Sequence, residues 1–277
     1  VKAAIARSGM DAGAFGHTVI GNVIHGEARD MYISRVISVN AGVPKHAPAL
    51  TVNRLCGSGL QAIVSAAQTV MLGDCEAAIA GGAESMSNGG YMLPRMRFGA
   101  RMGESNVIDM MQGALYDPFG HGLMGITAEN IASRYGINRQ TQDAFAAESQ
   151  RRAAAAIDAG YFQDQIVGVP VKSRRETVDF DTDEHPRDVT VEKLGAMKTI
   201  FKADGSVTAG NASGINDGAA ALTLVAESAV SKLGGTPLAR IVAYGHAGVE
   251  PDEMGIGPVP AVKIALAKAG LKAADLD

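Results

Sequence analysis

Apolar residues recur along the chain in short blocks with helical or strand-like spacing, separated by glycines. A helix is predicted over residues 58–72, where the apolar positions at helical spacing are Leu60, Ile63, Val64, Ala67 and Met71. Further helices are predicted over residues 127–135 and 138–159, each followed by a glycine that favours a helix end. Short apolar runs predict strands at residues 19–24, 49–53, 76–80, 166–171, 219–225 and 238–244, the third running into a turn at Gly81 and Gly82. This alternation predicts an α/β fold with a largely buried sheet.

Two segments depart from this regular pattern. Residues 86–122 show no periodicity and are rich in glycine and methionine, so we expect an inserted loop region there. Residues 1–10 and 262–271 share the pattern apolar-basic-x-Ala-apolar-Ala-basic-x-Gly-apolar. The match indicates either two related halves or two unrelated alanine-rich helices. With related halves, we expect a chain shortened at both ends, whose second half stops after one strand and one helix.

The composition excludes several classes of protein. Hydrophobic residues make up 47% of the 277 residues and charged residues 19%, which excludes a disordered chain. No apolar stretch approaches the roughly 18 residues that a membrane span needs, and a net charge of −4 gives no general attraction to nucleic acid or anionic lipid. Two cysteines cannot form a disulfide framework, so we expect a reducing compartment. The 34 glycines are typical of the active-site loops of α/β enzymes.

Cys56 is the candidate nucleophile. It lies on a predicted strand–turn–helix segment, two residues before Ser58, the expected N-cap of the helix. A turn of this kind presents a side chain at the end of the sheet where open α/β folds bind ligands, and the helix N-terminus stabilises a thiolate. Because Gly57 and Gly59 carry no Cβ, a substrate is able to approach backbone N–H groups that hold an oxyanion. The alternative is a buried structural cysteine beside a glycine turn.

Five segments resemble motifs of the thiolase family, the acetyl-CoA C-acyltransferases. They are NRLCGSGLQA at residues 53–62, GGAESMS at 81–87, MGITAEN at 124–130, TAGNASGINDGAA at 208–220 and MGIGPVPA at 254–261. All five occur in the family's order and together cover essentially the whole chain. The sequence is most similar to bacterial broad-specificity β-ketothiolases.

The resemblance implies a duplicated α/β fold in layers αβαβα, with a loop domain inserted in the first half and an incomplete second half. We therefore expect residues 1–85 and 215–236 to form the N-terminal thiolase half, without its first strand. Residues 86–214 would be the inserted loop domain, and residues 237–277 the start of the C-terminal half.

The resemblance also implies a reaction and its residues. Cys56 would take the acyl group from acyl-CoA as a thioester, with its own backbone N–H in the oxyanion hole. Ser213 matches a residue near the pantetheine arm of CoA, and Met124 and Met254 match methionines that line the acyl and pantetheine pocket. Lys198 aligns with a CoA-contacting arginine of some members, keeping the charge without the planar fork. The reaction is thiolysis of a 3-ketoacyl-CoA or the reverse condensation, with CoA thioesters as substrates and no cofactor or metal.

Several family features are missing from the sequence. Many members have a histidine where this chain has Leu123, and His121 lies two residues earlier. The family's Asn-Glu-Ala-Phe, Gly-His-Pro and Cys-x-Gly motifs do not occur up to Asp277. Since these motifs supply the base and the second cysteine, we expect this chain alone to acylate Cys56 slowly and to be inactive in the overall reaction.

Other polar and nucleophilic residues are interpreted as structural or solvated. Cys75 lies at the start of a predicted buried strand and is expected to be a structural thiol. Alternate aspartates resemble the start of a calcium loop, but the positions that need Gly and Glu hold Glu and Thr, so we predict a solvated acidic hairpin; they are Asp179, Asp181 and Asp183. A basic group is read as a solvated face, with binding of the CoA phosphates as the alternative; it comprises Lys172, Arg174 and Arg175.

We expect a homodimer or homotetramer that binds acyl-CoA and CoA, and no nucleic acid or membrane. We predict a location in the bacterial cytoplasm, and a location in an organelle is not excluded by the sequence. Two other functions also stay open. The first is a ketoacyl-synthase-like condensing enzyme, which the fourth and fifth motifs disfavour. The second is a non-catalytic acyl-CoA-binding or scaffold protein.

Overall fold

The computed structural model describes residues 1–174 and 176–277, and Arg175 lies outside them. The chain divides into two compact units. The first comprises Val1–Tyr116, Ile215–His246 and Ala261–Asp277, and the second comprises Asp117–Gly214 and Ala247–Pro260. No helix in the described part of the chain is long and apolar enough to cross a membrane.

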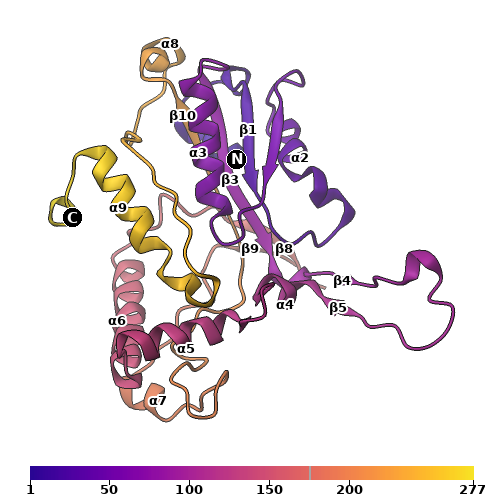
Figure 1. Ribbon diagram of the computed structural model, residues 1–277. Helices are drawn as coiled ribbons and strands as arrows, with labels where there is room; N and C mark the ends of the chain where they lie inside the picture. Colours follow the sequence, from indigo (N-terminus) through magenta and orange to yellow (C-terminus); the bar gives the residue numbers. More distant parts are fainter. Residues whose placement is uncertain (175) are drawn as a thin grey trace. The chain divides into compact units, whose positions relative to one another are not determined.

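A four-stranded sheet in the order β10-β3-β1-β2 forms the centre of the first unit (Figure 1). β1 (His17–Gly21) pairs in parallel with β2 (Ala49–Val52) on one side and with β3 (Ala77–Ser85) on the other. β10 (Asp217–Val225) adds an antiparallel strand along the whole of β3. The parallel part agrees with the predicted α/β sheet, and it brings the ends of β1, β2 and β3 to one edge.

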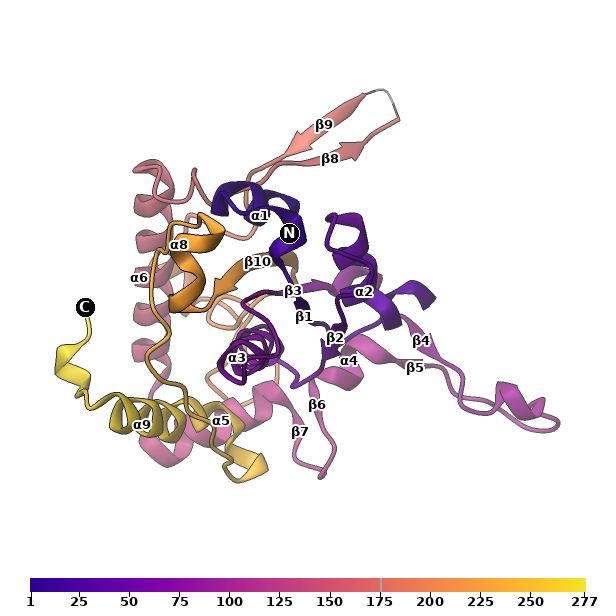
Figure 2. The same ribbon diagram turned by 90° about the horizontal axis from the view of Figure 1, so that it is seen from above.

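β1 and the first part of β3 are buried on both faces, as the apolar runs predict, whereas most of β10 is exposed. α3 (Ser58–Met71) covers one face, whereas α1 (Lys2–Ser8) and α2 (Ile33–Asn40) lie on the other (Figure 2). The core on the α3 side contains Val19, Ala62, Ala66, Ala67, Ala78, Ala80 and Leu224. The core on the opposite side contains Ile5, Met10, Phe15, Val43, Ala47, Ala77 and Ile79. Successive β3 residues thus alternate between the two cores, which is the period of two expected for a strand.

Two strand predictions need correction. β3 does not turn at Gly81 and Gly82 but runs on to Ser85, because it is paired on both sides there. A Cβ on Gly81 would lie 2.5 Å from the Ala220 carbonyl oxygen, so glycine lets the two strands approach closely rather than ending one.

Residues 238–244 do not form the predicted strand. None of the described strands pairs with this segment, so its backbone has no ladder to complete. It runs as extended chain beside two helices. The Gln68 side chain donates a hydrogen bond to the Tyr244 hydroxyl at 2.8 Å, and Lys268 of α9 (Pro258–Ala269) donates to the Tyr244 carbonyl at 3.1 Å.

The helix predictions are confirmed, with small changes at their ends. α3 matches the predicted span, but its buried face carries more alanine than expected, since Leu60 and Met71 are 69% and 76% exposed. α1 and α9, which contain most of the two similar decapeptides, are both followed by a glycine with positive φ, Gly9 at 73° and Gly270 at 70°. Short elements follow β3 in place of a regular motif: β4 (Tyr91–Met92), β5 (Ile108–Asp109), α4 (Met110–Ala114) and β6 (Tyr116–Asp117).

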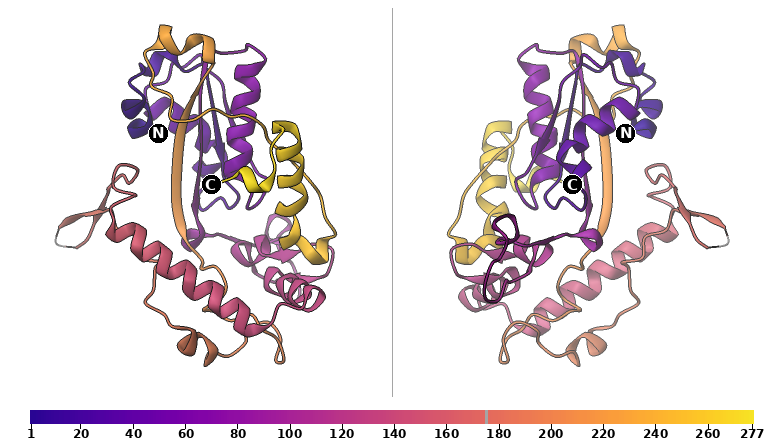
Figure 3. Two further views of the ribbon diagram at one scale, coloured as in Figure 1. Left: turned by 90° about the vertical axis from the view of Figure 1, so that its left-hand side faces the viewer. Right: turned by 90° about the vertical axis from the view of Figure 1, so that its right-hand side faces the viewer.

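The second unit is mainly helical. After β7 (Gly122–Leu123) come α5 (Met124–Tyr135) and the long α6 (Arg139–Asp158). The hairpin of β8 (Val169–Lys172) and β9 (Thr177–Phe180) follows α6 in the chain, and α7 (Val191–Gly195) comes next (Figure 3). The predicted strand at 166–171 is therefore shifted towards the C-terminus. The chain returns to the first unit through β10, and α8 (Val230–Leu233) follows it.

Candidate active site

Cys56 lies on a short turn between β2 and α3, as the sequence predicts, and its side chain is exposed. The N-cap of α3 is Gly57, whereas Ser58 is the first helical residue, so the predicted N-cap is off by one. The Gly57 and Ser58 N–H groups donate to the carbonyls of Arg54 and Leu55 at 3.1 and 2.9 Å. These two donors are therefore satisfied inside the turn.

The turn is held in one conformation by side-chain hydrogen bonds. The buried Ser58 hydroxyl donates to the Leu55 carbonyl at 2.6 Å and accepts from the Arg54 N–H at 2.8 Å. The Asn53 side chain accepts from the Leu55 N–H at 2.9 Å. Leu55, directly before Cys56, has a φ of 46°, a region that residues with a Cβ seldom occupy. The local contacts thus enforce a strained residue beside the candidate nucleophile.

Cys75 has the surroundings of a structural thiol. It is half-buried in the connection between α3 and β3. Burial raises the pKa of its thiol, although a hydrogen bond with Thr69 opposes the shift. A Cβ on Gly16 would lie 2.6 Å from the Cys75 Cβ, so the backbones pack closely there. The thiolate form of Cys75 is therefore disfavoured at neutral pH.

The four predicted CoA-binding residues all lie in the second unit, whereas Cys56 lies in the first. Met124 begins α5, and Met254 lies half-exposed in a 3-10 helix, η6 (Pro251–Ile256), that packs on α5. The Asn130 amide of α5 donates to the Asp252 carbonyl at 3.1 Å, and a Cβ on Gly255 would lie 3.0 Å from Ile131. The second unit therefore brings together the helices that carry the two predicted methionines.

Ser213 is exposed on a loop that buried carboxylates of the second unit hold in place. Glu129 of α5 accepts hydrogen bonds from the N–H groups of Ser206 and Val207 and from the Ser206 hydroxyl, at 2.7 to 2.9 Å. Asp143 of α6 accepts from the Asn211 amide at 2.9 Å and pairs with Arg139 at 2.7 Å. The backbone leading to Ser213 is thereby anchored to both helices.

The remaining predicted residues have simpler surroundings. Lys198 is exposed after α7, and His121 is exposed beside β7, with its backbone N–H donating to the buried Asp117 carboxylate at 3.0 Å. Among the described residues no group of three His, Cys, Asp or Glu side chains is placed to hold a metal ion. The acidic segment includes the end of an exposed hairpin strand, β9, as predicted.

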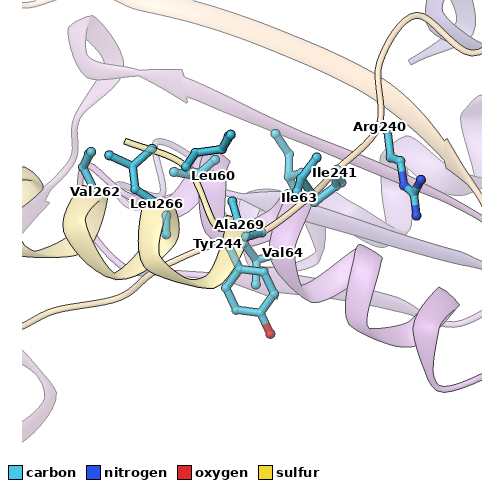
Figure 4. Close-up of a pocket in the computed structure, with 13 residues that line it drawn as sticks. Leu60, Ile63, Val64, Arg240, Ile241, Tyr244, Val262, Leu266 and Ala269 are labelled. Atoms are coloured by element: carbon cyan, nitrogen blue, oxygen red, sulfur yellow. The ribbon is translucent and has the colours of Figure 1, made fainter. Parts of the chain in front are cut away.

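An apolar groove lies along the outer side of α3 in the first unit (Figure 4). It is lined by Leu60, Ile63 and Val64 of α3, by residues 240–244, and by α9 residues that include Val262, Leu266 and Ala269. Arg240 supplies its one charged side chain among the lining residues. Cys56 is not among those residues, so this groove is separate from the nucleophile turn.

Several residues that support the site have no role in the sequence-based prediction. Glu84 lies within the second motif, Glu129 within the third, and Asn211 within the fourth. Each of these side chains forms a hydrogen bond with a residue far away in the sequence. The separation is 60 residues or more for the two glutamates and 68 residues for Asn211. The sequence does contain a signal for these roles, namely a charged or amide residue within a glycine-rich segment. Such a residue needs hydrogen-bond partners when it is buried.

Comparison with known proteins identifies the family. The family model described as "Thiolase, N-terminal domain" matches residues 1–228, and "Thiolase, C-terminal domain" matches residues 235–277. The chain is 58% identical over 279 residues to the beta-ketothiolase BktB of Cupriavidus necator, and 46% identical over 281 residues to an acetyl-CoA acetyltransferase of Pseudomonas aeruginosa. Each match covers 100% of this chain and 71% of the relative.

Solved structures give the same result. The crystal structure of human mitochondrial 3-ketoacyl-CoA thiolase superposes with a TM-score of 0.97 at 42% sequence identity, covering 100% of this chain and 70% of that chain. A crystal structure of the same human enzyme in complex with CoA gives a TM-score of 0.94.

The chain has the fold and the motifs of an acyl-CoA acyltransferase. It belongs to the thiolase family, and the predicted fold class is confirmed. Neither the ketoacyl-synthase alternative nor the non-catalytic alternative is favoured by these relatives. The compartment stays a prediction, since the relatives include bacterial proteins and a mitochondrial one.

Proposed function

We propose that this thiolase makes or cleaves 3-ketoacyl-CoA through an acyl-enzyme on Cys56. The observation that carries the proposal is the exposed Cys56 on a hydrogen-bonded turn at the N-terminus of α3. The position at the end of β2 makes the Cys56 side chain accessible to a substrate. The second cysteine, Cys75, is half-buried with its pKa raised and does not compete for this role.

In the cleavage direction, the Cys56 thiolate attacks the 3-keto carbon of the substrate. The bond between the second and third carbons then breaks, and its electron pair leaves with acetyl-CoA, which gains a proton. The remaining acyl group is held as a thioester on Cys56 until the CoA thiol attacks it, releasing the shortened acyl-CoA and the free cysteine. We propose that the Cys56 backbone N–H stabilises the oxyanion in both steps.

Met124, Met254, Ser213 and Lys198 are proposed to bind the acyl-CoA. The two methionines offer flexible apolar contacts for the acyl chain and the pantetheine arm. Ser213 would bind the pantetheine arm from its anchored loop, and Lys198 the CoA phosphates. We propose that no metal or prosthetic group takes part. We also propose that residues 1–85 and 215–236 form the N-terminal thiolase half, residues 86–214 the inserted loop domain, and residues 237–277 the start of the C-terminal half.

Iodoacetamide at neutral pH is expected to alkylate Cys56 at least about tenfold faster than Cys75, because thiolate content and exposure set the rate. The raised pKa of Cys75 means that its labelling should increase as the pH rises above the ordinary thiol range. Prior incubation with acetyl-CoA, long enough to allow slow acylation, should protect Cys56. Peptide mass spectrometry measures both sites. Equal labelling, or no protection by acetyl-CoA, would contradict the proposed nucleophile.

We also propose a homodimer or homotetramer with closed symmetry. Support comes from exposed large apolar side chains in the segment after β3, namely Tyr91, Met92, Leu93, Met96, Phe98, Met102, Val107 and Ile108. Leaving these side chains in water is unfavourable, and a second copy of the chain would cover them. Light scattering at micromolar concentration should report a mass of two or four chains. A monomer would contradict the proposal.

A further inference from the structure

The first turn of α3 lies directly on the end of β1. Gly21, the last residue of β1, is buried, and a Cβ placed on it would lie 2.6 Å from the Ser58 carbonyl carbon. The same Cβ would lie 2.7 Å from the Ser58 oxygen and 2.9 Å from the Gly59 nitrogen. These are backbone atoms, which cannot rotate away as a flexible side chain does. The contact between β1 and α3 therefore requires glycine at position 21.

This contact falls on the residue that closes the Cys56 turn. The Ser58 hydroxyl accepts a hydrogen bond from the Arg54 N–H and donates one to the carbonyl of the strained Leu55. Cys56 lies between these bonded residues. Any displacement of the Ser58 backbone from β1 thus displaces the turn that carries Cys56.

The end of β1 is in turn held by a carboxylate from β3. Glu84 accepts hydrogen bonds from the Val23 and Ile24 N–H groups, both at 2.9 Å, and from the Asn22 side-chain amide at 3.2 Å. The Asn22 backbone N–H donates to the Val52 carbonyl at 3.1 Å, at the end of β2. Glu84 thereby ties the end of β1 to β3, and the Asn22 backbone ties it to the end of β2, from which the nucleophile turn starts.

We propose that Gly21 and Glu84 are positioning residues for the nucleophile. Gly21 sets how closely the N-terminus of α3 approaches the sheet, and Glu84 fixes the strand end that Gly21 occupies. Together they place Cys56 without touching the substrate. The inference rests on the proposed role of Cys56. Misplacement of a reacting group by about 1 Å lowers a rate by up to about a hundredfold, so the effect is measurable.

Two glycines of the sheet form one matched pair for the test, and Glu84 of β3 with Glu76, directly before β3, forms the other. A Cβ on Gly82 of β3 would meet the Gly59 Cα at 3.5 Å, an ordinary contact, so Gly82→Ala is the control for Gly21→Ala. Glu76 forms an exposed ion pair with Lys232 at 2.7 Å, so Glu76→Gln is the control for Glu84→Gln. The glutamine at position 84 keeps the shape but replaces one acceptor oxygen with a donor, which faces backbone N–H groups.

The experiment measures two rates: alkylation of Cys56 by iodoacetamide at a series of pH values, and acetyl transfer from acetyl-CoA to Cys56. Circular dichroism and the labelling of Cys75 report whether each variant is folded. Gly21→Ala and Glu84→Gln should each lower both rates by about tenfold or more and change the pH profile of alkylation. Gly82→Ala and Glu76→Gln should leave both rates unchanged.

Unchanged rates and pH profile in folded Gly21→Ala and Glu84→Gln, even with a lower melting temperature, would overturn the proposal. If Gly21→Ala labels at Cys75 as fast as the unfolded chain, that variant has unfolded, and the nearly isosteric Glu84→Gln then tests the proposal. Unfolding of both variants would show a purely structural role and overturn the proposal. Failure of the proposed function gives a different result from failure of this positioning role. If the unsubstituted protein shows no selective alkylation or acetylation of Cys56, the nucleophile assignment itself fails.

Discussion

Cys56→Ala is expected to abolish the release of CoA from acetyl-CoA, by at least about a hundredfold relative to the unsubstituted protein. The alanine methyl group has no lone pair with which to attack the thioester carbonyl, so neither an acyl-enzyme nor free CoA forms. CoA is measured by liquid chromatography under single-turnover conditions, with protein in excess over acetyl-CoA. This readout needs only the first half-reaction, in which the acyl group moves to the protein.

Cys75→Ala serves as the matched control, because it removes the second cysteine from a half-buried position outside the nucleophile turn. We expect it to release CoA at the rate of the unsubstituted protein. CoA release that persists in Cys56→Ala, or that disappears equally in Cys75→Ala, would be incompatible with the proposed assignment.

Asp143→Ala is expected to lower the free energy of unfolding by about 3–5 kcal/mol, because it breaks a buried ion pair. Asp143 is 1% exposed, and its carboxylate binds both Arg139 and the Asn211 amide. Removal leaves the arginine without its carboxylate partner and the amide without an acceptor. Urea denaturation monitored by circular dichroism measures the change.

Glu148→Ala, on the same helix, provides the control. Glu148 also pairs with arginines, Arg151 and Arg152, both at 2.7 Å, but its side chain is 41% exposed. Exposed ion pairs contribute little to stability because water screens them and the side chains lose freedom. We therefore expect no measurable change in the urea midpoint. Comparable losses in the two variants would show that burial does not decide the contribution of these pairs.

The Asp143 substitution also has a consequence for binding. Because Asn211 lies two residues before Ser213, loss of its partner should loosen the loop that presents Ser213. We expect weaker CoA binding by Asp143→Ala than by Glu148→Ala when both are measured by calorimetry well below their unfolding temperatures.

The nucleophile turn was predictable from sequence because its determinants are local. β2, the turn and α3 follow one another within residues 49–71, and strand spacing, glycines and helix periodicity all lie in that window. The helix ends at Gly9, Gly136 and Gly270 were predictable for the same reason, since each glycine adopts the positive φ that ends a helix.

The rest depends on contacts between distant segments. The sequence of residues 238–244 has strand propensity, but no described strand pairs with it, and propensity alone does not form a sheet. The doubled glycine at 81 and 82 is typical of a turn, yet close approach of β10 requires the first of them inside a strand. The roles of Glu84 and Glu129 depend on which backbone N–H groups the fold brings to their carboxylates.

The central claim is that Cys56 carries the acyl group. The most direct measurement incubates the protein with saturating acetyl-CoA for long enough to allow slow acylation, quenches it in acid and locates the acetyl group by peptide mass spectrometry. We expect one acetyl group on the peptide containing Cys56, lost on treatment with hydroxylamine as a thioester is, and none on the peptide containing Cys75. An acetylated Cys75, or a protein that stays unmodified at saturating acetyl-CoA, would contradict it.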